Sequence, residues 1–126
     1  NTLGQLGNGT TTNSSTPVAV SMPAPTFTHM SAGAFHTCAY ATDSSIYCWG
    51  ANNNGQLGNN TTTPSMIPVA INMPAGVSAT HVSVGYSHTC LATMTQGVWC
   101  WGYNALGQLG DASIINRKVP NLVVMP

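Results

Sequence analysis

Charged side chains are nearly absent from this sequence of 126 residues. They make up 3% of the chain, and two acids and two bases give a formal net charge of zero. Proteins bind nucleic acids largely through Lys and Arg side chains that neutralise phosphates, and attraction to anionic membranes needs a basic cluster. The four charged residues, Asp43, Asp111, Arg117 and Lys118, supply neither. We therefore expect no nucleic-acid partner and no attraction to anionic membranes.

Long apolar runs and paired carboxylates are missing as well. No stretch approaches the roughly 18 apolar residues that span a bilayer, so we expect no membrane insertion. The two Asp residues fall at different points of the chain, which leaves no carboxylate pair for glycoside hydrolysis. A calcium site needs several oxygen ligands with carboxylates among them. These absences predict a non-enzymatic protein without catalytic residues, metal or cofactor.

The sequence does contain an internal repeat, which is the first feature to look for in a chain rich in turn residues. The tetrapeptide GQLG occurs three times, and a polar stretch, a Pro, a short apolar run and Met-Pro follow each time. The tetrapeptides lie at Gly4–Gly7, Gly55–Gly58 and Gly107–Gly110. The spacing divides the chain into the rear part of one repeat, residues 1–23, and two full repeats, residues 24–74 and 75–126.

Each full repeat shows short runs of strand-forming residues separated by Gly, Asn, Asp and Thr, and no window has a sustained helical period. We therefore predict an all-β fold with four antiparallel strands per repeat, the layout of a propeller blade. The expected strands are Phe27–Ala32, His36–Ala41, Ile46–Trp49 and Val69–Met73, then Thr80–Val84, His88–Ala92, Val98–Trp101 and Leu122–Met125.

The repeated frame resembles the repeat of the regulator-of-chromosome-condensation family over nearly the whole chain. The matching positions in the first full repeat are Gly33, His36, Cys38, Cys48, Trp49, Gly50 and Gly55–Gly58. They recur as Gly85, His88, Cys90, Cys100, Trp101, Gly102 and Gly107–Gly110. The resemblance implies a seven-bladed β-propeller. Two repeats and a fragment cannot close such a ring, so further blades are expected from a longer chain or from other copies, for example in a trimer.

Members of this family perform unrelated functions, including nucleotide exchange on a small nuclear GTPase, chromatin binding and inhibition of a secreted β-lactamase. The scarcity of charge disfavours the nuclear functions, and the paired cysteines resemble the exported bacterial branch. We expect a recognition module of an exported or cell-surface protein, such as an adhesin or receptor-binding propeller, with a protein or carbohydrate ligand. The alternatives are a secreted enzyme inhibitor and an intracellular regulator of a GTPase or of chromatin.

The four cysteines fall into two pairs, each placed symmetrically about a predicted turn. Cys38 and Cys48 are each five residues from Asp43, and Cys90 and Cys100 are each five residues from Thr95. Opposed residues of a hairpin are close enough for a disulfide, so we predict Cys38–Cys48 and Cys90–Cys100, which indicate an oxidising compartment. The alternatives are buried free thiols, a zinc site that includes His36, or a Cys–His nucleophile.

Other repeated residues are predicted to be structural. Trp49 and Trp101 should pack between neighbouring blades, and His36 and His88 should form hydrogen bonds in the core. His29 and His81 recur at the same interval and are also predicted to be structural. Gly55 and Gly107 begin GQLG turns, which have neither the Lys nor the following helix of a phosphate loop.

The variable loops are the expected ligand contacts, because loops on a rigid scaffold commonly carry function. The candidate residues are Asn52, Asn53, Asn54, Thr61, Thr62 and Tyr103, together with the rest of the segments 10–15, 61–65 and 114–118. Four Asn residues, Asn8, Asn13, Asn59 and Asn60, also lie in glycosylation sequons. We interpret these sequons as a coincidence of Thr- and Asn-rich loops.

Overall fold

The computed structural model describes residues 1–22 and 25–126 and forms two four-stranded antiparallel sheets in the orders β1-β2-β3-β4 and β5-β6-β7-β8. The strands are β1 (Phe27–Ala32), β2 (His36–Ala41), β3 (Ile46–Gly50), β4 (Ser65–Ala70), β5 (Ala79–Val84), β6 (His88–Thr93), β7 (Val98–Gly102) and β8 (Arg117–Leu122). The all-β prediction is confirmed. The expected repeat boundary between residues 23 and 24 lies outside the described residues. Within them, no helix has the length and apolar character to cross a membrane.

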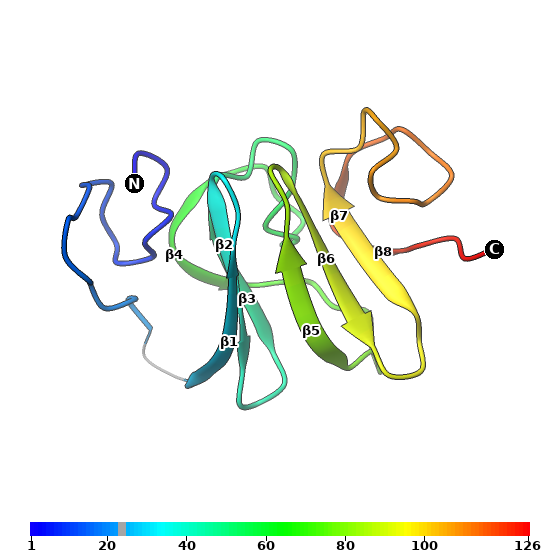
Figure 1. The fold of residues 1–126 in the computed structure, drawn as a ribbon, viewed down its shortest axis with the longest axis horizontal. Coiled ribbons are helices and arrows are strands. Elements are labelled where there is room, and N and C mark those ends of the chain that lie inside the picture. The colour runs from blue at the N-terminus through cyan, green and yellow to red at the C-terminus, as the bar shows by residue number, and fades with distance from the viewer. Residues whose placement is uncertain (23–24) are drawn as a thin grey trace.

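The two sheets stand side by side as blades, with the N-terminal segment flanking β4 and the C-terminal segment flanking β8 (Figure 1). The contact between the blades runs through β5, which packs against both β1 and β2. Apolar side chains fill this junction: buried Cys38, Ile46 and Cys48 of the first blade join buried Leu91 and half-buried Val82 of the second in one cluster. Because burial of apolar area is the main favourable term in folding, the junction holds the blades together.

The fourth strand of each blade differs from the sequence prediction. We expected Val69–Met73 and Leu122–Met125, but β4 and β8 begin four or five residues earlier and end at Ala70 and Leu122. Each strand contains a Pro, Pro68 or Pro120, which a sheet tolerates at an edge or bulge because Pro cannot donate to the ladder. The pairing register does shift between Cys48 and Gly50, opposite Pro68.

The early end of each fourth strand has a physical cause in the preceding loop. The amide of Asn72 donates to the carbonyl of Gly58 at 2.8 Å, and Val124 donates to Gly110 at the same distance. These bonds draw the chain away from β3 or β7 and toward the GQLG turn of its own repeat. The other six strands lie within one residue of the predicted bounds.

Candidate functional site

Each blade contains one disulfide between its two central strands. Cys38 lies opposite Cys48 in the β2–β3 ladder, and Cys90 lies opposite Cys100 in the β6–β7 ladder. Both pairs are bonded, with Cα atoms 4.1 Å apart. The predicted pairing is confirmed, and no cysteine remains to act as a thiolate ligand or nucleophile. Among the described residues there is also no group of three or more His, Cys, Asp or Glu side chains that could hold a metal ion.

The GQLG turns connect one blade to the next through the two tryptophans. The indole Nε1 of Trp49 donates to the carbonyl of Gln5 at 2.8 Å, and that of Trp101 donates to the carbonyl of Gln56 at 2.9 Å. Both indoles are fully buried. Gly58 has a φ of +69°, and a Cβ there would lie 2.6 Å from Trp101 Nε1. The turn therefore needs Gly both for its backbone conformation and for close approach to the ring.

His36 lies in the same junction and is 1% exposed. Its Nε2 lies 2.8 Å from the hydroxyl of Thr89, which itself donates to the carbonyl of Gln56 at 2.9 Å. Since the hydroxyl has a single proton, Nε2–H must be the donor to Thr89. Nδ1 of His36 is then the acceptor nitrogen, and it has no hydrogen-bond partner among the described residues.

Burial and, to a smaller extent, the nearby His88 lower the pKa of His36 to about 4. The imidazole is therefore neutral at pH 7, as desolvation of a charged form requires. His88 occupies the equivalent position in the second blade but is half-buried, and its ring lies against Gly85. The two histidines have the same place in the repeat and different surroundings.

A buried Asn organises the loop that follows β3, and this corrects one predicted contact. Asn52 is fully buried. Its amide nitrogen lies 3.0 to 3.3 Å from four oxygen atoms of Asn59, Thr61 and Thr63, and its oxygen accepts the amide of Leu57. The prediction of a ligand contact is wrong for Asn52, because its polar atoms are used to fold the loop. Thr61 also directs its hydroxyl to Asn59 at 2.7 Å.

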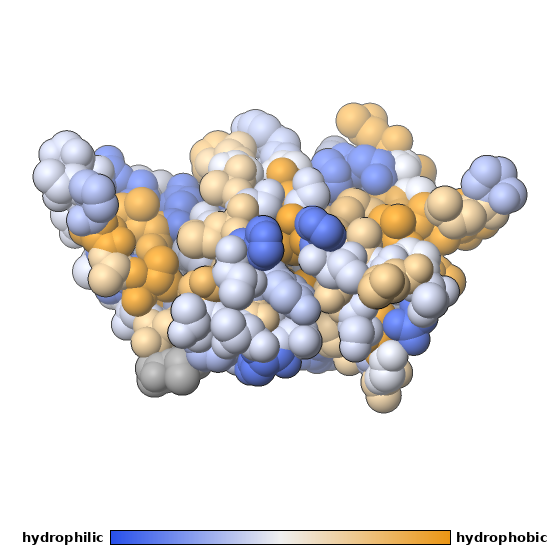
Figure 2. All heavy atoms as spheres, turned by 60° about the horizontal axis from the view of Figure 1, so that its bottom comes forward, coloured by the Kyte–Doolittle hydropathy of each residue, from blue (hydrophilic) through white to orange (hydrophobic). Residues whose placement is uncertain are grey.

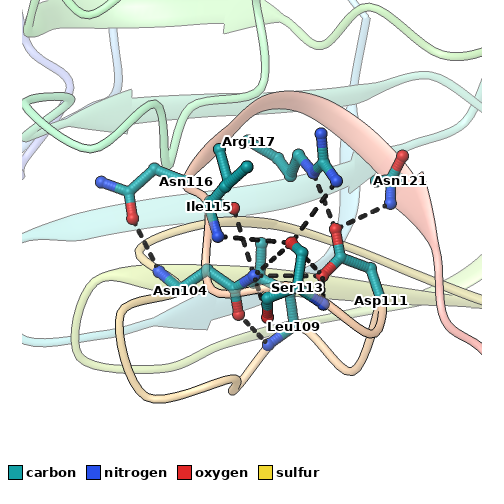
Figure 3. A network of polar contacts seen from close by, with 8 residues as sticks. All are labelled: Asn104, Leu109, Asp111, Ser113, Ile115, Asn116, Arg117 and Asn121. Atoms are coloured by element: carbon teal, nitrogen blue, oxygen red, sulfur yellow. Dashed lines mark hydrogen bonds and ion pairs between the residues drawn. The ribbon is translucent and has the colours of Figure 1, made fainter.

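The loop after β7 has the same central amide and an added charge pair (Figure 3). Asn104 holds the loop as Asn52 does, and its neighbour in the network is Asp111, whose side chain is 1% exposed. Asp111 accepts hydrogen bonds from the Ser113 hydroxyl at 2.7 Å and from Arg117 Nε at 2.7 Å. The equivalent residue in the first blade is the uncharged Asn59, so the ion pair stabilises this loop alone.

The Asp111 carboxylate is held in its charged form. The hydrogen bond from the Ser113 hydroxyl lowers its pKa most; burial opposes this, and Arg117 and Asn104 add to the lowering. The resulting pKa is about 2. A carboxylate with this pKa is a poor general acid or base near neutral pH, which assigns Asp111 to loop structure.

Two exposed aromatic rings meet on the edge of the molecule formed by the β1–β2 and β5–β6 turns. Phe35 and Tyr86 have ring centroids 5.4 Å apart and interplanar angle 88°, and they are 39% and 69% exposed. Hydrogen bonds join these turns to the variable loops: Ala51 donates to the Phe35 carbonyl at 2.8 Å, and Tyr103 donates to the Ser87 carbonyl at 2.9 Å. We call this surface, the two turns with residues 51–54 and 103–106, the turn face.

The sequence analysis did not identify Phe35 and Tyr86. Phe35 stands two residues after Gly33, whereas Tyr86 stands one residue after the equivalent Gly85, so the two aromatic residues do not align in the repeat. The sequence signal that could have identified them is one aromatic residue in each tight turn. Their contact depends on how β5 packs against β1 and β2, which the sequence pattern does not specify.

The other predicted contacts are distributed over the variable loops. Asn53 and Thr62 are exposed, while Asn54 and Tyr103 are half-buried. The structure brings Asn54 together with Asn116 of the next loop, whose amide donates to the Asn54 oxygen at 3.2 Å. Asn53, Asn54 and Tyr103 belong to the turn face, and Thr62 lies farther along its loop.

Comparison with known families identifies the repeat. The model described as "Regulator of chromosome condensation (RCC1) repeat" matches residues 1–40 and 43–92. A second model of the same description matches residues 27–56 and 79–108. Together these matches cover the N-terminal segment, the first blade and strands β5 to β7 of the second blade.

Curated relatives are similar over much of this chain. The ultraviolet-B receptor UVR8 of Arabidopsis thaliana is 31% identical over 95% of the chain, which corresponds to 28% of the receptor. The probable E3 ubiquitin-protein ligase HERC4 of Homo sapiens is 33% identical over 72% of the chain and 9% of the ligase. The RCC1 domain-containing protein RUG3, mitochondrial, of Arabidopsis thaliana is 34% identical over 72% of the chain and 20% of that protein. The chain thus spans less than a third of each.

Solved structures show the same fold. Human WBSCR16 superposes with a TM-score of 0.78 and 20% identity over 98% of this chain and 33% of its own. Prp20p from Saccharomyces cerevisiae, reported with its binding to Gsp1p and histones, superposes with a TM-score of 0.72 and 16% identity over 83% of this chain and 27% of its own. At these identities the likeness establishes the fold of the blades.

Proposed function

This chain belongs to the regulator of chromosome condensation (RCC1) repeat family, and we propose that it is a non-enzymatic recognition module that binds a protein through the turn face. The observation that carries the proposal is the exposed pair Phe35 and Tyr86 on a rigid, disulfide-linked scaffold. Aromatic side chains dominate the energetic centres of protein interfaces because they bury large areas with little loss of conformational entropy.

The surroundings of the pair suit a protein ligand better than a carbohydrate. Leu106, in the loop after β7, is 84% exposed and adds apolar area to the turn face. An apolar centre with a polar rim is the usual anatomy of a protein interface. Prp20p is described as binding histones. The present chain has only two acidic residues, so it lacks the negative charge that would attract such basic partners.

We propose further that the module belongs to an exported or cell-surface protein. Both cysteine pairs are disulfides, and structural disulfides persist mainly in oxidising compartments. The module would be completed by further blades, from the same longer chain or from other copies, since a closed ring leaves no open sheet edge. An intracellular regulator is the alternative, and one relative, RUG3, is named as mitochondrial.

The binding proposal is tested with the immobilised chain and two variants. The double variant Phe35→Ser with Tyr86→Ser removes the aromatic pair, and Met94→Ser is the matched control. Met94 is 87% exposed in the turn between β6 and β7, at the opposite ends of the strands. Proteins from the medium and membrane fraction of the source organism are the probes.

We expect a protein that binds the wild type and Met94→Ser equally and the double variant at least roughly tenfold more weakly, as for loss of an interface centre. Equal binding to all three forms would contradict the assignment to the turn face. A glycan array run on the same forms separates the ligand classes. Glycan binding that depends on Phe35 and Tyr86, without a protein ligand, would replace the protein proposal with a carbohydrate-binding adhesin.

A further inference from the structure

Two exposed histidines, one from each blade, lie beside each other where β1 contacts β5. His29 is on β1 and His81 is on β5; their ring centroids are 6.3 Å apart, and the ring planes are inclined at 56°. The other two histidines differ, because His36 is buried with Nε2 bonded to Thr89, and His88 is half-buried. His29 and His81 are therefore the pair of imidazoles that a ligand from solution can reach together.

The strands that carry the two histidines are held in one arrangement. The amide of Val84 on β5 donates to the hydroxyl of Ser31 on β1 at 3.0 Å. Ser31 is two residues after His29 and so belongs to the same face of β1. Just beyond these strands, a Cβ on Gly33 would collide with the carbonyl oxygen of Gly85, so the two turns are in close contact. The junction between the blades therefore fixes the spacing of the backbone positions that bear the imidazoles.

A β-bulge precedes each of these histidines. The pairing register shifts just before His29 on β1 and just before His81 on β5. The unpaired residue in each bulge is a Thr, Thr28 or Thr80, and its hydroxyl donates to a carbonyl of the next strand. Bulges re-aim the side chains beside them and are common near functional sites. The same local device thus places both histidines.

The hydrogen bonds around His29 leave one ring nitrogen free to bind a metal ion. Thr28 uses its single hydroxyl proton on the carbonyl of Tyr40 at 3.3 Å. The 3.2 Å contact between His29 Nδ1 and the Thr28 hydroxyl oxygen must then be donated by Nδ1–H. The lone pair of the neutral ring is therefore on Nε2, and a bond from the other nitrogen is the usual way to orient a metal-binding imidazole. His81 is exposed, so its ring can turn to present the second nitrogen.

The separation of the two rings suits ligands on opposite sides of one ion. A metal–nitrogen bond of about 2.0 Å places a ring centroid about 3 Å from the ion, so two opposed imidazoles would have centroids about 6 Å apart. The observed separation of 6.3 Å is close to this value. The tetrahedral geometry of Zn²⁺ would bring the centroids to about 5 Å. Square-planar coordination by nitrogen and oxygen is typical of Cu²⁺, which also binds such ligands most strongly among the divalent first-row metals.

The surroundings of the pair do not oppose a cation. The two basic side chains, Arg117 and Lys118, are on β8, at the opposite edge of the second sheet from β5. All four cysteines are in disulfides, so no thiolate competes for the ion. Figure 2 shows strongly hydrophilic side chains in the middle of the molecule, over the region where the blades meet, with apolar surface toward both ends. Water can therefore reach an ion bound there and fill its remaining positions.

We propose that His29 and His81 bind one Cu²⁺ ion between them, with water as the other ligands. The site needs no carboxylate, the ligand type whose scarcity led us to expect no metal. Its two protein ligands are 52 residues apart in sequence and come from different blades. The folded chain therefore binds the ion more tightly than the unfolded chain, and the bound ion stabilises the junction. This inference does not depend on the turn face or on its protein ligand.

The test is a calorimetric titration of the full chain with Cu²⁺ near neutral pH, in the presence of glycine as a weak competing chelator. The variants His29→Gln and His81→Gln each remove one proposed ligand. His88→Gln is the matched control, because it also removes one imidazole but leaves the pair intact. Urea unfolding of each form with and without Cu²⁺ is the second measurement, and its metal-free arm shows that each variant is folded.

We expect the wild type and His88→Gln to bind one Cu²⁺ ion per chain with similar affinity. His29→Gln and His81→Gln should each bind it at least roughly tenfold more weakly. Cu²⁺ should raise the urea midpoint of the first two forms and leave that of the other two nearly unchanged. A wild type without saturable binding, or an affinity that either single variant leaves unchanged, overturns the proposal. Tighter binding of Zn²⁺ than of Cu²⁺ would overturn the assignment of the ion.

Discussion

At the scale of single residues, His36 couples the junction between the blades to pH. Its folded-state pKa of about 4 lies below the ordinary value of 6.5, so the unfolded chain takes up the proton first. The contribution of His36 to the free energy of unfolding is then constant above about pH 6.5. It falls as the pH is lowered toward 4, by up to about 3 kcal/mol. Urea unfolding at several pH values measures this slope.

The variant His36→Gln keeps a neutral donor for Thr89 and removes the titration, so its stability should change less over the same pH range. His29→Gln is the matched control, since His29 is exposed on β1. Its pH profile should follow that of the wild type. A His36→Gln profile as steep as the wild type's would show that another group causes the loss of stability.

Asp111 gives a second residue-scale prediction. Asp111→Asn keeps an oxygen for Ser113 and Asn104, as Asn59 does in the first blade, and loses the bonds that Arg117 and Asn121 donate to the second oxygen. Asp111→Ala leaves buried Asn104 without one of its acceptors. We expect the Ala variant to lose about 2 kcal/mol of unfolding free energy and the Asn variant about half of that. Denaturant unfolding at pH 7 compares them, and equal losses would contradict a role based on hydrogen bonding.

The sequence could predict residues whose role repeats and could not predict those whose role depends on tertiary contacts. Trp49 and Trp101 recur, and the structure places both in contact with GQLG turns. Asn52 looked like a surface contact because it stands in a run of three Asn residues, yet the first of the three is buried as the centre of its loop. Phe35 and Tyr86 were missed because they meet only after the blades pack.

At the scale of elements, each blade depends on its disulfide-linked β-hairpin. The bonds join residues 10 apart in sequence, and closing a loop of this size stabilises a fold by about 2–3 kcal/mol in the chain-entropy account. The double variants Cys38→Ala with Cys48→Ala and Cys90→Ala with Cys100→Ala should each lose at least this amount.

The first double variant should lose more than the second. Cys38 and Cys48 are fully buried between the blades, whereas Cys90 is half-buried, and cavities in a packed core add to the cost. Denaturant unfolding of the oxidised proteins measures both losses. If the second variant were the less stable of the two, the junction would not be the principal core.

The sequence was sufficient to predict that each strand is present, but it was not sufficient to predict the bounds of the fourth strands, β4 and β8. β1 and β2 match their predicted ranges because turn residues at Gly33 and Asp43 bound these short runs of strand-forming residues. β4 and β8 do not, because the carbonyls of Gly58 and Gly110 divert the chain after Ile71 and Val123. Those carbonyls belong to the GQLG turn earlier in the same repeat, and no pattern within the strand itself predicts the contact.

At the scale of the whole molecule, the repeat was sufficient to predict the family and the division into blades of four strands. The spacing of GQLG and of the paired cysteines was sufficient for the all-β fold and for the disulfides. The proposed partner surface could not be obtained in this way, because it lies in turns and loops that differ between the repeats. The fold and the disulfides follow from what the repeats share, and the turn face follows from how they differ.

The most direct test of the account is the intact mass of the protein isolated from its natural source, measured under denaturing conditions before and after reduction. The account predicts a mass lower than the reduced form by two hydrogens for each of the disulfides Cys38–Cys48 and Cys90–Cys100. That result supports an exported recognition module. Four free thiols in the isolated protein would contradict it and would make an intracellular regulator the better account of this chain.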